Sequence, residues 1–121
     1  MTRYYANKVL SASGSSSDQN LDFNAEAFYE NLSVYIDVTV LTAGAIDYKL
    51  QAKDQISGLY VDIPGAAFTQ ITAIGTYRLS VGPGITTVSG KAANVLLAKQ
   101  LRLVEDLTTG PATRSINLEW S

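Results

Sequence analysis

Residues 32–41 read Leu-Ser-Val-Tyr-Ile-Asp-Val-Thr-Val-Leu, and this stretch decides the fold. Aliphatic residues occupy every second position, with polar or polar-tipped residues between them; the aliphatic row is Leu32, Val34, Ile36, Val38 and Val40. A strand points successive side chains to opposite faces, whereas a helix would scatter these aliphatics around its axis. The β-branched content favours a strand independently. We therefore expect a central strand with one buried face.

The same alternation recurs along the chain, with turn residues between the runs. Residues 46–52 alternate like 32–41, and the tight connection at 42–45 predicts a hairpin between the two. Residues 21–31 favour a short strand and a turn, with a single helical turn as the alternative. Further strands are expected at 9–12, 59–63, 67–72, 75–81, within 95–107 and at 113–121. About seven or eight short strands predict an all-β antiparallel sandwich, immunoglobulin-like or jelly-roll, or a small barrel.

The chain divides into an N-terminal extension and one domain. Residues 1–20 are expected to form an extended arm and a Ser-rich loop, and residues 21–121 a single β-sandwich. Tyr4 and Tyr5 are adjacent, so in a strand they face opposite ways. One can join the core while the other meets a partner, or both can cover the edge of their own domain. Val9 and Leu10 extend this candidate contact segment.

The composition excludes several classes of function. The chain has 121 residues, a net charge of −2 and no cluster of Lys and Arg, so no nucleic-acid partner is expected. It has no cysteine and no histidine, which removes thiol chemistry, the commonest general base and the commonest metal ligand. No apolar run approaches the length of a membrane span, and residues 1–8 lack the apolar core of a secretory signal.

The remaining polar residues do not predict a catalytic centre. The serines lack a histidine to activate them, and no lysine is placed beside a serine by the pattern. Asp37 and Asp47 are expected on the outward face of one hairpin, close to Lys49, where they would solubilise the surface. Asp54 and Asp62 complete the set of candidate carboxylates, and residues 54–58 lack the alternating acids of a calcium loop. No catalytic residue, cofactor or metal is therefore expected.

Aromatic residues are the remaining means of binding a ligand. Tyr48, Tyr77 and Trp120 fall on the predicted core faces of their strands. Tyr35 and Tyr60 are expected to point outward, where they can contact a partner or stack on a sugar. A carbohydrate- or receptor-binding module is therefore an alternative to an assembly protein.

Several segments in combination resemble a known group of proteins. They are residues 34–44 (VYIDVTVLTAG), 47–51 (DYKLQ), 58–71 (GLYVDIPGAAFTQI), 75–79 (GTYRL) and 101–104 (LRLV), followed by a Gly-Pro turn before the last strand. The pattern resembles small β-sandwich structural proteins of tailed-bacteriophage virions and covers residues 31–120. The chain departs from it at 53–58, where the group has a more acidic, glycine-rich loop, and at 105–107, where it often has an aromatic residue.

The resemblance implies a non-enzymatic capsid decoration, or cement, protein. Such a protein sits on the capsid exterior after synthesis in the host cytoplasm, bridges subunits of the major capsid protein, and forms a homo-oligomer, either trimer or dimer. A tail or head-tail connector component is the near alternative. On this interpretation the residues expected to contact partners are Tyr4, Tyr5, Val9, Leu10, Tyr35 and Tyr60.

Overall fold

The computed structural model describes residues 4–12, 17–25, 29–42, 44–94, 98–108 and 112–121, with the backbone alone for 4–12 and 17–19. These residues contain nine strands and no helix. The strands are β1 (Tyr4–Ala12), β2 (Ser17–Asn24), β3 (Leu32–Leu41), β4 (Ile46–Lys53), β5 (Tyr60–Ala67), β6 (Gly75–Gly82), β7 (Ala92–Asn94), β8 (Gln100–Leu107) and β9 (Ala112–Trp120).

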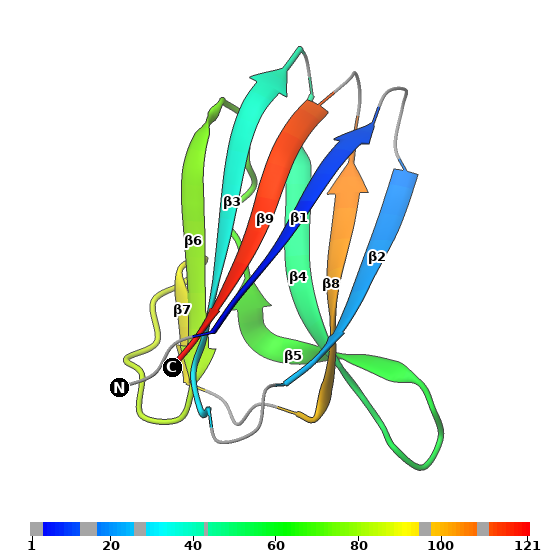
Figure 1. The fold of residues 1–121 in the computed structure, drawn as a ribbon, viewed down its shortest axis with the longest axis vertical. Helices are drawn as coiled ribbons and strands as arrows, with labels where there is room; N and C mark the ends of the chain where they lie inside the picture. The colour runs from blue at the N-terminus through cyan, green and yellow to red at the C-terminus, as the bar shows by residue number, and fades with distance from the viewer. Residues whose placement is uncertain (1–3, 13–16, 26–28, 43, 95–97, 109–111) are drawn as a thin grey trace.

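The strands form two facing sheets, with the orders β1-β9-β3-β6-β7 and β2-β8-β4-β5 (Figure 1). We call them sheet A and sheet B. Four antiparallel pairs lie one inside another along the chain: β1 with β9, β2 with β8, β3 with β6, and β4 with β5. A nested hairpin rolled across two sheets in this way is a jelly roll. The structure confirms the antiparallel sandwich and selects the jelly-roll strand order.

This strand order overturns the predicted hairpin of β3 and β4. β3 pairs with β6 and β9 in sheet A, whereas β4 pairs with β5 and β8 in sheet B. The connection at 42–45 therefore crosses from one sheet to the other. Both strands bury one face against the same core, so their sequence patterns look like those of a hairpin although they never pair.

Residues 4–12 and 17–24 form strands of the sandwich and not a projecting arm. β1 pairs with β9 from Tyr4 to Ala12, and β2 runs across the domain boundary expected at residue 20. Each sheet thus takes one of its two edge strands from the first 24 residues, β1 in sheet A and β2 in sheet B. Without these strands, one edge of β8 and one of β9 would lose their hydrogen-bonding partners.

Several strand boundaries also differ from the predicted ones. β5 continues through Pro64 to Ala67, which is possible because β5 is an edge strand and Pro cannot donate into a central ladder. In the segment expected as a strand at 67–72, Ala67 ends β5, and the residues after it form a single bridge, from Ile71 to Ile46. Within the described residues of the run at 95–107, the strand extends from Gln100 to Leu107, and residues 95–97 lie outside the described part.

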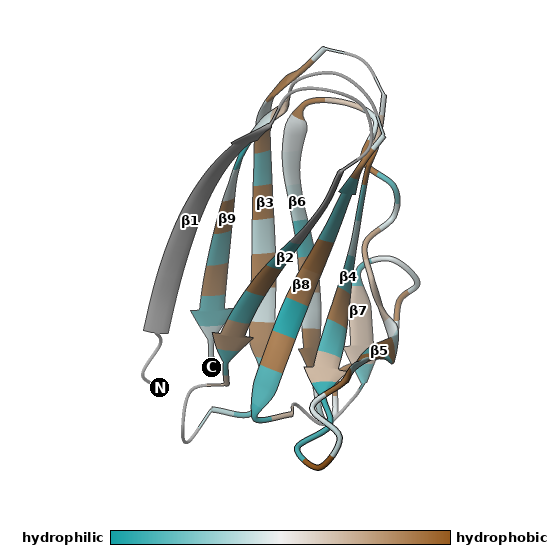
Figure 2. Ribbon diagram, turned by 90° about the vertical axis from the view of Figure 1, so that its right-hand side faces the viewer, coloured by the Kyte–Doolittle hydropathy of each residue, from teal (hydrophilic) through white to brown (hydrophobic). Residues whose placement is uncertain are grey.

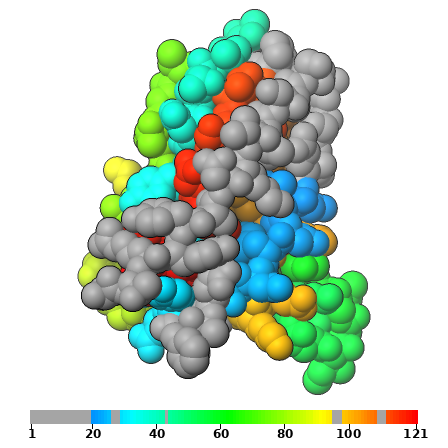
Figure 3. All heavy atoms as spheres, in the orientation of Figure 1, coloured from blue at the N-terminus to red at the C-terminus, as the bar shows by residue number. Residues whose placement is uncertain are grey.

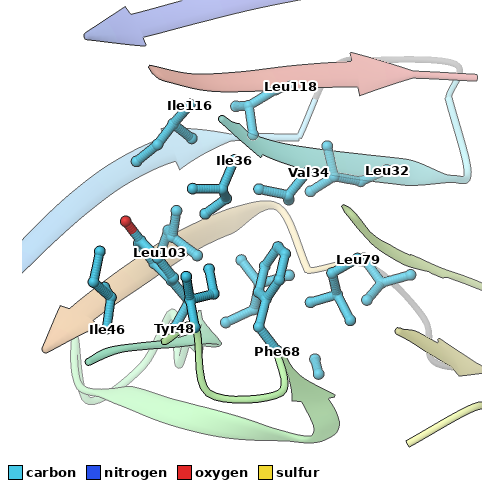
Figure 4. Close-up of a cluster of buried hydrophobic side chains, with 14 of the residues drawn as sticks. Leu32, Val34, Ile36, Ile46, Tyr48, Phe68, Leu79, Leu103, Ile116 and Leu118 are labelled. Atoms are coloured by element: carbon cyan, nitrogen blue, oxygen red, sulfur yellow. The ribbon is translucent and has the colours of Figure 1, made fainter. Parts of the chain in front are cut away.

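The core forms from the alternate side chains of the two sheets. Leu32, Val34 and Ile36 of β3 are fully buried, as the period of two predicts. Figure 4 shows them beside Ile116 and Leu118 of β9, facing side chains from the other sheet such as Tyr48 and Leu103. The matching alternation of hydropathy along β8 and β9 is visible in Figure 2. The burial of this row confirms the core face predicted from residues 32–38.

Val40 departs from the predicted row, because 46% of its surface is exposed. The register of β3 against β9 shifts between Val38 and Val40, and the pairing with β6 ends at Val38. Such an irregularity breaks the strict alternation of faces. The inclusion of Val40 in the core face was therefore wrong.

A buried ion pair joins the two sheets inside the core. The guanidinium of Arg114 (β9) donates from Nε and Nη2 to the carboxylate of Glu105 (β8), and from Nη1 to the carbonyl of Ala112 at 2.7 Å. The hydroxyl of Tyr48 (β4) donates to Glu105 Oε2 at 2.5 Å. Glu105 and Arg114 are both fully buried. Burial, followed by the charge of Glu105, raises the pKa of Tyr48 far above its usual value, so the phenol stays protonated and remains a donor.

Candidate contact surface at the β4–β5 hairpin

The candidate carboxylates lie apart, each with its own polar partner. Asp37 accepts a hydrogen bond from Thr76 on the outer face of sheet A, whereas Asp47 accepts one from Gln70 beside sheet B. Lys49, expected beside these two, instead forms an ion pair with Asp62 at 3.1 Å. Within the described ranges no three residues among His, Cys, Asp and Glu gather as metal ligands do. The shared outward face predicted for Asp37 and Asp47 does not exist, since their strands lie in different sheets.

Tyr35 and Tyr60 both lie on outer faces, half-buried, but on opposite sheets. The guanidinium of Arg102 lies 3.7 Å from the centre of the Tyr60 ring and is held there by an ion pair with Asp22. The guanidinium of Arg78 lies 5.8 Å from the centre of the Tyr35 ring. The two rings therefore cannot form a single platform for a sugar.

The other predicted aromatic and N-terminal residues fall as follows. Tyr48 and Trp120 are buried as expected, and Tyr77 is half-buried against the core with its hydroxyl donating to the carbonyl of Ala73. The remaining candidate contacts lie in β1, whose backbone pairs with β9; they are Tyr4, Tyr5, Val9 and Leu10. Their side chains lie outside the described part of the structure.

An apolar surface lies at the β4–β5 hairpin, around residues 53–58, which join the strands expected at 46–52 and 59–63. Ile63 packs against the core, and Val61, two residues earlier on the same face, is 58% exposed. Leu59 continues this row at 67% exposure, and Ile56 at the tip is 98% exposed. The hairpin projects beyond the body of the sandwich as a separate lobe (Figures 1 and 3). The row of core-facing side chains on β5 thus continues past the end of sheet A. We call the exposed residues Ile56, Leu59 and Val61 the hairpin patch.

The loop that carries the hairpin patch is held by Asp54. Its carboxylate accepts hydrogen bonds from the amide of Ile56 and the hydroxyl of Ser57, both at 2.9 Å. Its backbone amide donates to the carbonyl of Leu59, and its carbonyl accepts from the amide of Gly58. Gly58 has a φ of 76°, a conformation that favours glycine. The loop is therefore shaped before any partner arrives, which lowers the entropic cost of binding.

Acidification is expected to release the carboxylate cap of this loop. The hydrogen bonds from the Ile56 amide and from Ser57 lower the pKa of Asp54 below its usual value of about 3.9. The hydrogen bonds to the Asp54 carboxylate are therefore complete above its usual pKa. They are lost as the pH falls through the lowered pKa that Asp54 has in the folded protein. An NMR titration of the Ile56 amide should show its main inflection below pH 3.9. In Asp54→Asn this inflection should be absent; an inflection at or above 3.9 in the wild-type protein would contradict the cap.

The signal for the hairpin patch was present in the sequence. Ile56 stands alone among polar residues in KDQISG, residues 53–58, and an isolated aliphatic at a loop tip has no core to reach. The pattern at 59–63 predicts Leu59 and Val61 as ordinary strand residues. Their exposure depends on where the opposite sheet ends, which the pattern along one strand does not contain.

Neither the models of known protein families nor the curated protein sequences match the chain. The described part of the chain has no helix with the length and apolar content to cross a membrane. The functional assignment therefore rests on the surface of the sandwich and on the motif resemblance given above.

Proposed function

We propose that this chain is a non-enzymatic structural protein of a tailed-phage virion, most simply a capsid decoration protein that bridges subunits of the major capsid protein on the outer shell. The observation that carries the proposal is the hairpin patch. Several exposed apolar side chains on one preshaped projection are typical of surfaces that contact another protein. Jelly rolls occur among viral capsid domains and also among lectins, so the fold is compatible with the proposal without selecting it.

The physical role follows from linkage between binding and capsid state. A protein that binds the expanded shell and not its precursor stabilises the expanded state by mass action. A projecting hairpin suits this role, because it can enter a gap between subunits that opens only on expansion. A homotrimer or homodimer would multiply such contacts through avidity.

The experiment is a binding assay on expanded capsids of the cognate phage that lack this protein. Wild-type chain is mixed with capsids and sedimented, and the copies per particle are counted by quantitative mass spectrometry. A copy number matched to the major capsid protein would establish decoration. A small symmetric number would place the chain at the connector or tail, and absence of binding would overturn the proposal and direct attention to glycan arrays.

Introducing charge into the hairpin patch is expected to abolish this binding. Ile56→Asp with Leu59→Asp should weaken capsid affinity by at least about 30-fold, because buried interface anchors contribute about 2 kcal/mol or more. The matched control is Val40→Asp with Ile74→Asp, two exposed aliphatics near the far end of β3. Loss in the control and not in the hairpin variant would place the contact elsewhere. Circular dichroism of both variants checks that the fold persists.

A further inference from the structure

Strand β6 has an open outer edge along most of its length. On one side it pairs with β3 from Gly75 to Val81. On the other side β7 pairs only with Ser80, Val81 and Gly82. From Gly75 to Leu79 the outer edge therefore meets no strand in the described part of the sandwich. Open edges of this kind are templates for an added strand.

The backbone groups at this edge are those of Thr76 and Arg78. The amide of Ser80 donates to the carbonyl of Lys91 at 3.0 Å, so Ser80 directs its backbone groups toward β7. Backbone groups alternate in direction along a strand, and residues two apart point the same way. Thr76 and Arg78 consequently present two donors and two acceptors at the open edge.

A groove of about 650 Å³ lies beside this edge. Its apolar walls come from Phe68, Tyr77 and Ile85, and the turn at Gly90 closes it against Thr69. Gly90 has a φ of 74°, and a Cβ there would collide with Thr69 Oγ1, so this close approach requires glycine. The groove thus runs along the backbone donors and acceptors of Thr76 and Arg78, which pair with no strand in the described part of the sandwich.

The lining of the groove carries positive charge and no carboxylate. Arg78 and Lys91 both line it and both are exposed. Arg78 Nε donates to Ser80 Oγ at 2.9 Å, which fixes the guanidinium on the outer face of the sheet. Tyr77 occupies the opposite, core-side face of the same strand. An added strand would therefore meet apolar walls with one set of alternate side chains and Arg78 with the other, while Lys91 adds a second positive charge to the lining.

We propose that the open edge of β6 binds an extended segment of a partner protein as an added strand, with alternating apolar and acidic side chains. The backbone of the segment pairs with Thr76 and Arg78, its apolar side chains enter the groove, and its carboxylates lie against Arg78 and Lys91. This edge and the hairpin patch lie on opposite sides of the molecule (Figure 1). The site is independent of what binds the hairpin, and two separated contact surfaces are what a bridging protein requires.

The test is an NMR titration of the full chain with defined peptides. The probe is an acetylated seven-residue peptide of alternating Val and Glu. Its carbonyls should accept hydrogen bonds from the amides of Thr76 and Arg78, which would slow the hydrogen exchange of these amides and shift their signals. A peptide of alternating Val and Lys should cause neither change. A Val/Glu peptide with proline at its centre should also cause neither, because proline lacks the backbone donor. Absence of these changes at about 1 mM peptide, or equal binding of the Val/Lys peptide, would overturn the proposal.

Charge-reversal variants and two competing occupants complete the test. Arg78→Glu with Lys91→Glu should weaken Val/Glu binding at least about fivefold, since two exposed ion pairs become repulsive. Lys53→Glu with Lys99→Glu makes the same change in net charge away from the groove and should have no effect. Identical shifts caused by glucuronate alone would assign the groove to a small anion. Identical shifts on raising the protein concentration alone would assign it to a second copy. Either result would overturn the proposed partner.

Discussion

Replacing Arg114 by alanine is expected to lower the free energy of unfolding by about 3–5 kcal/mol. The reason is the position of Glu105, which is fully buried and takes two hydrogen bonds from the guanidinium. Without Arg114 its carboxylate would remain in the core, with Tyr48 as its remaining donor among the described residues. For a chain of this length the loss corresponds to a fall in Tm of about 10–20 °C. Urea unfolding followed by far-UV circular dichroism measures it.

Two controls separate the buried charge from ordinary packing. Lys49→Ala removes an exposed ion pair with Asp62 and should cost no more than about 1 kcal/mol. Replacing all three residues of the buried cluster with apolar ones should recover most of the stability. The triple variant is Tyr48→Phe, Glu105→Leu and Arg114→Met. A triple variant no more stable than Arg114→Ala would contradict the account, because the cost would then come from shape and not from the uncompensated charge.

Replacing Trp120 by alanine is expected to cost a similar 3–5 kcal/mol. Trp120 is buried at the end of β9, opposite Leu32 of β3 in the register of sheet A. Its ring meets that of Phe23 of β2 edge-on at 6.1 Å, so the contact joins the two sheets. Removal would leave a large cavity at the end of the sandwich, because the flanking strands are held by their ladders and cannot collapse.

The measurement for Trp120 is again urea unfolding. Circular dichroism is the probe, since Trp120 is the chain's one tryptophan and its fluorescence is lost with it. Trp120→Phe is the control and should lose less than half as much, because it keeps a ring against Phe23. A cost below about 1 kcal/mol for Trp120→Ala would show that the site tolerates the missing ring, against the expectation for a buried aromatic.

Local sequence patterns predicted the strands better than they predicted which strands pair. The period of two placed Leu32, Val34 and Ile36 in the core, because a strand's faces are set by the backbone alone. The same pattern suggested that β3 and β4 pair, which is wrong, since facing strands of one sandwich bury the same kind of face. The choice between pairing within a sheet and crossing to the other depends on all the strands together.

The surfaces were harder to predict than the core. Tyr35 and Tyr60 were correctly placed on outer faces, yet the pattern did not show that they lie on opposite sheets. Glu105 and Arg114 stand at core-facing positions of β8 and β9, a signal visible in the alternation with Leu103 and Ile116. The shared core-facing position of Glu105 and Arg114 could have suggested an ion pair between them, but this ion pair was not predicted.

The sequence alone determined that the chain forms strands, that Leu32, Val34 and Ile36 face the core, and that neither thiol nor imidazole chemistry is present. These are properties of single residues and of spacing along one strand. The tertiary structure decided the jelly-roll order, the burial of Arg114 with Glu105, the exposure of the hairpin patch and the open edge of β6. Each depends on where a neighbouring strand ends or which strand lies opposite, and no local pattern specifies such distances between segments far apart in the chain.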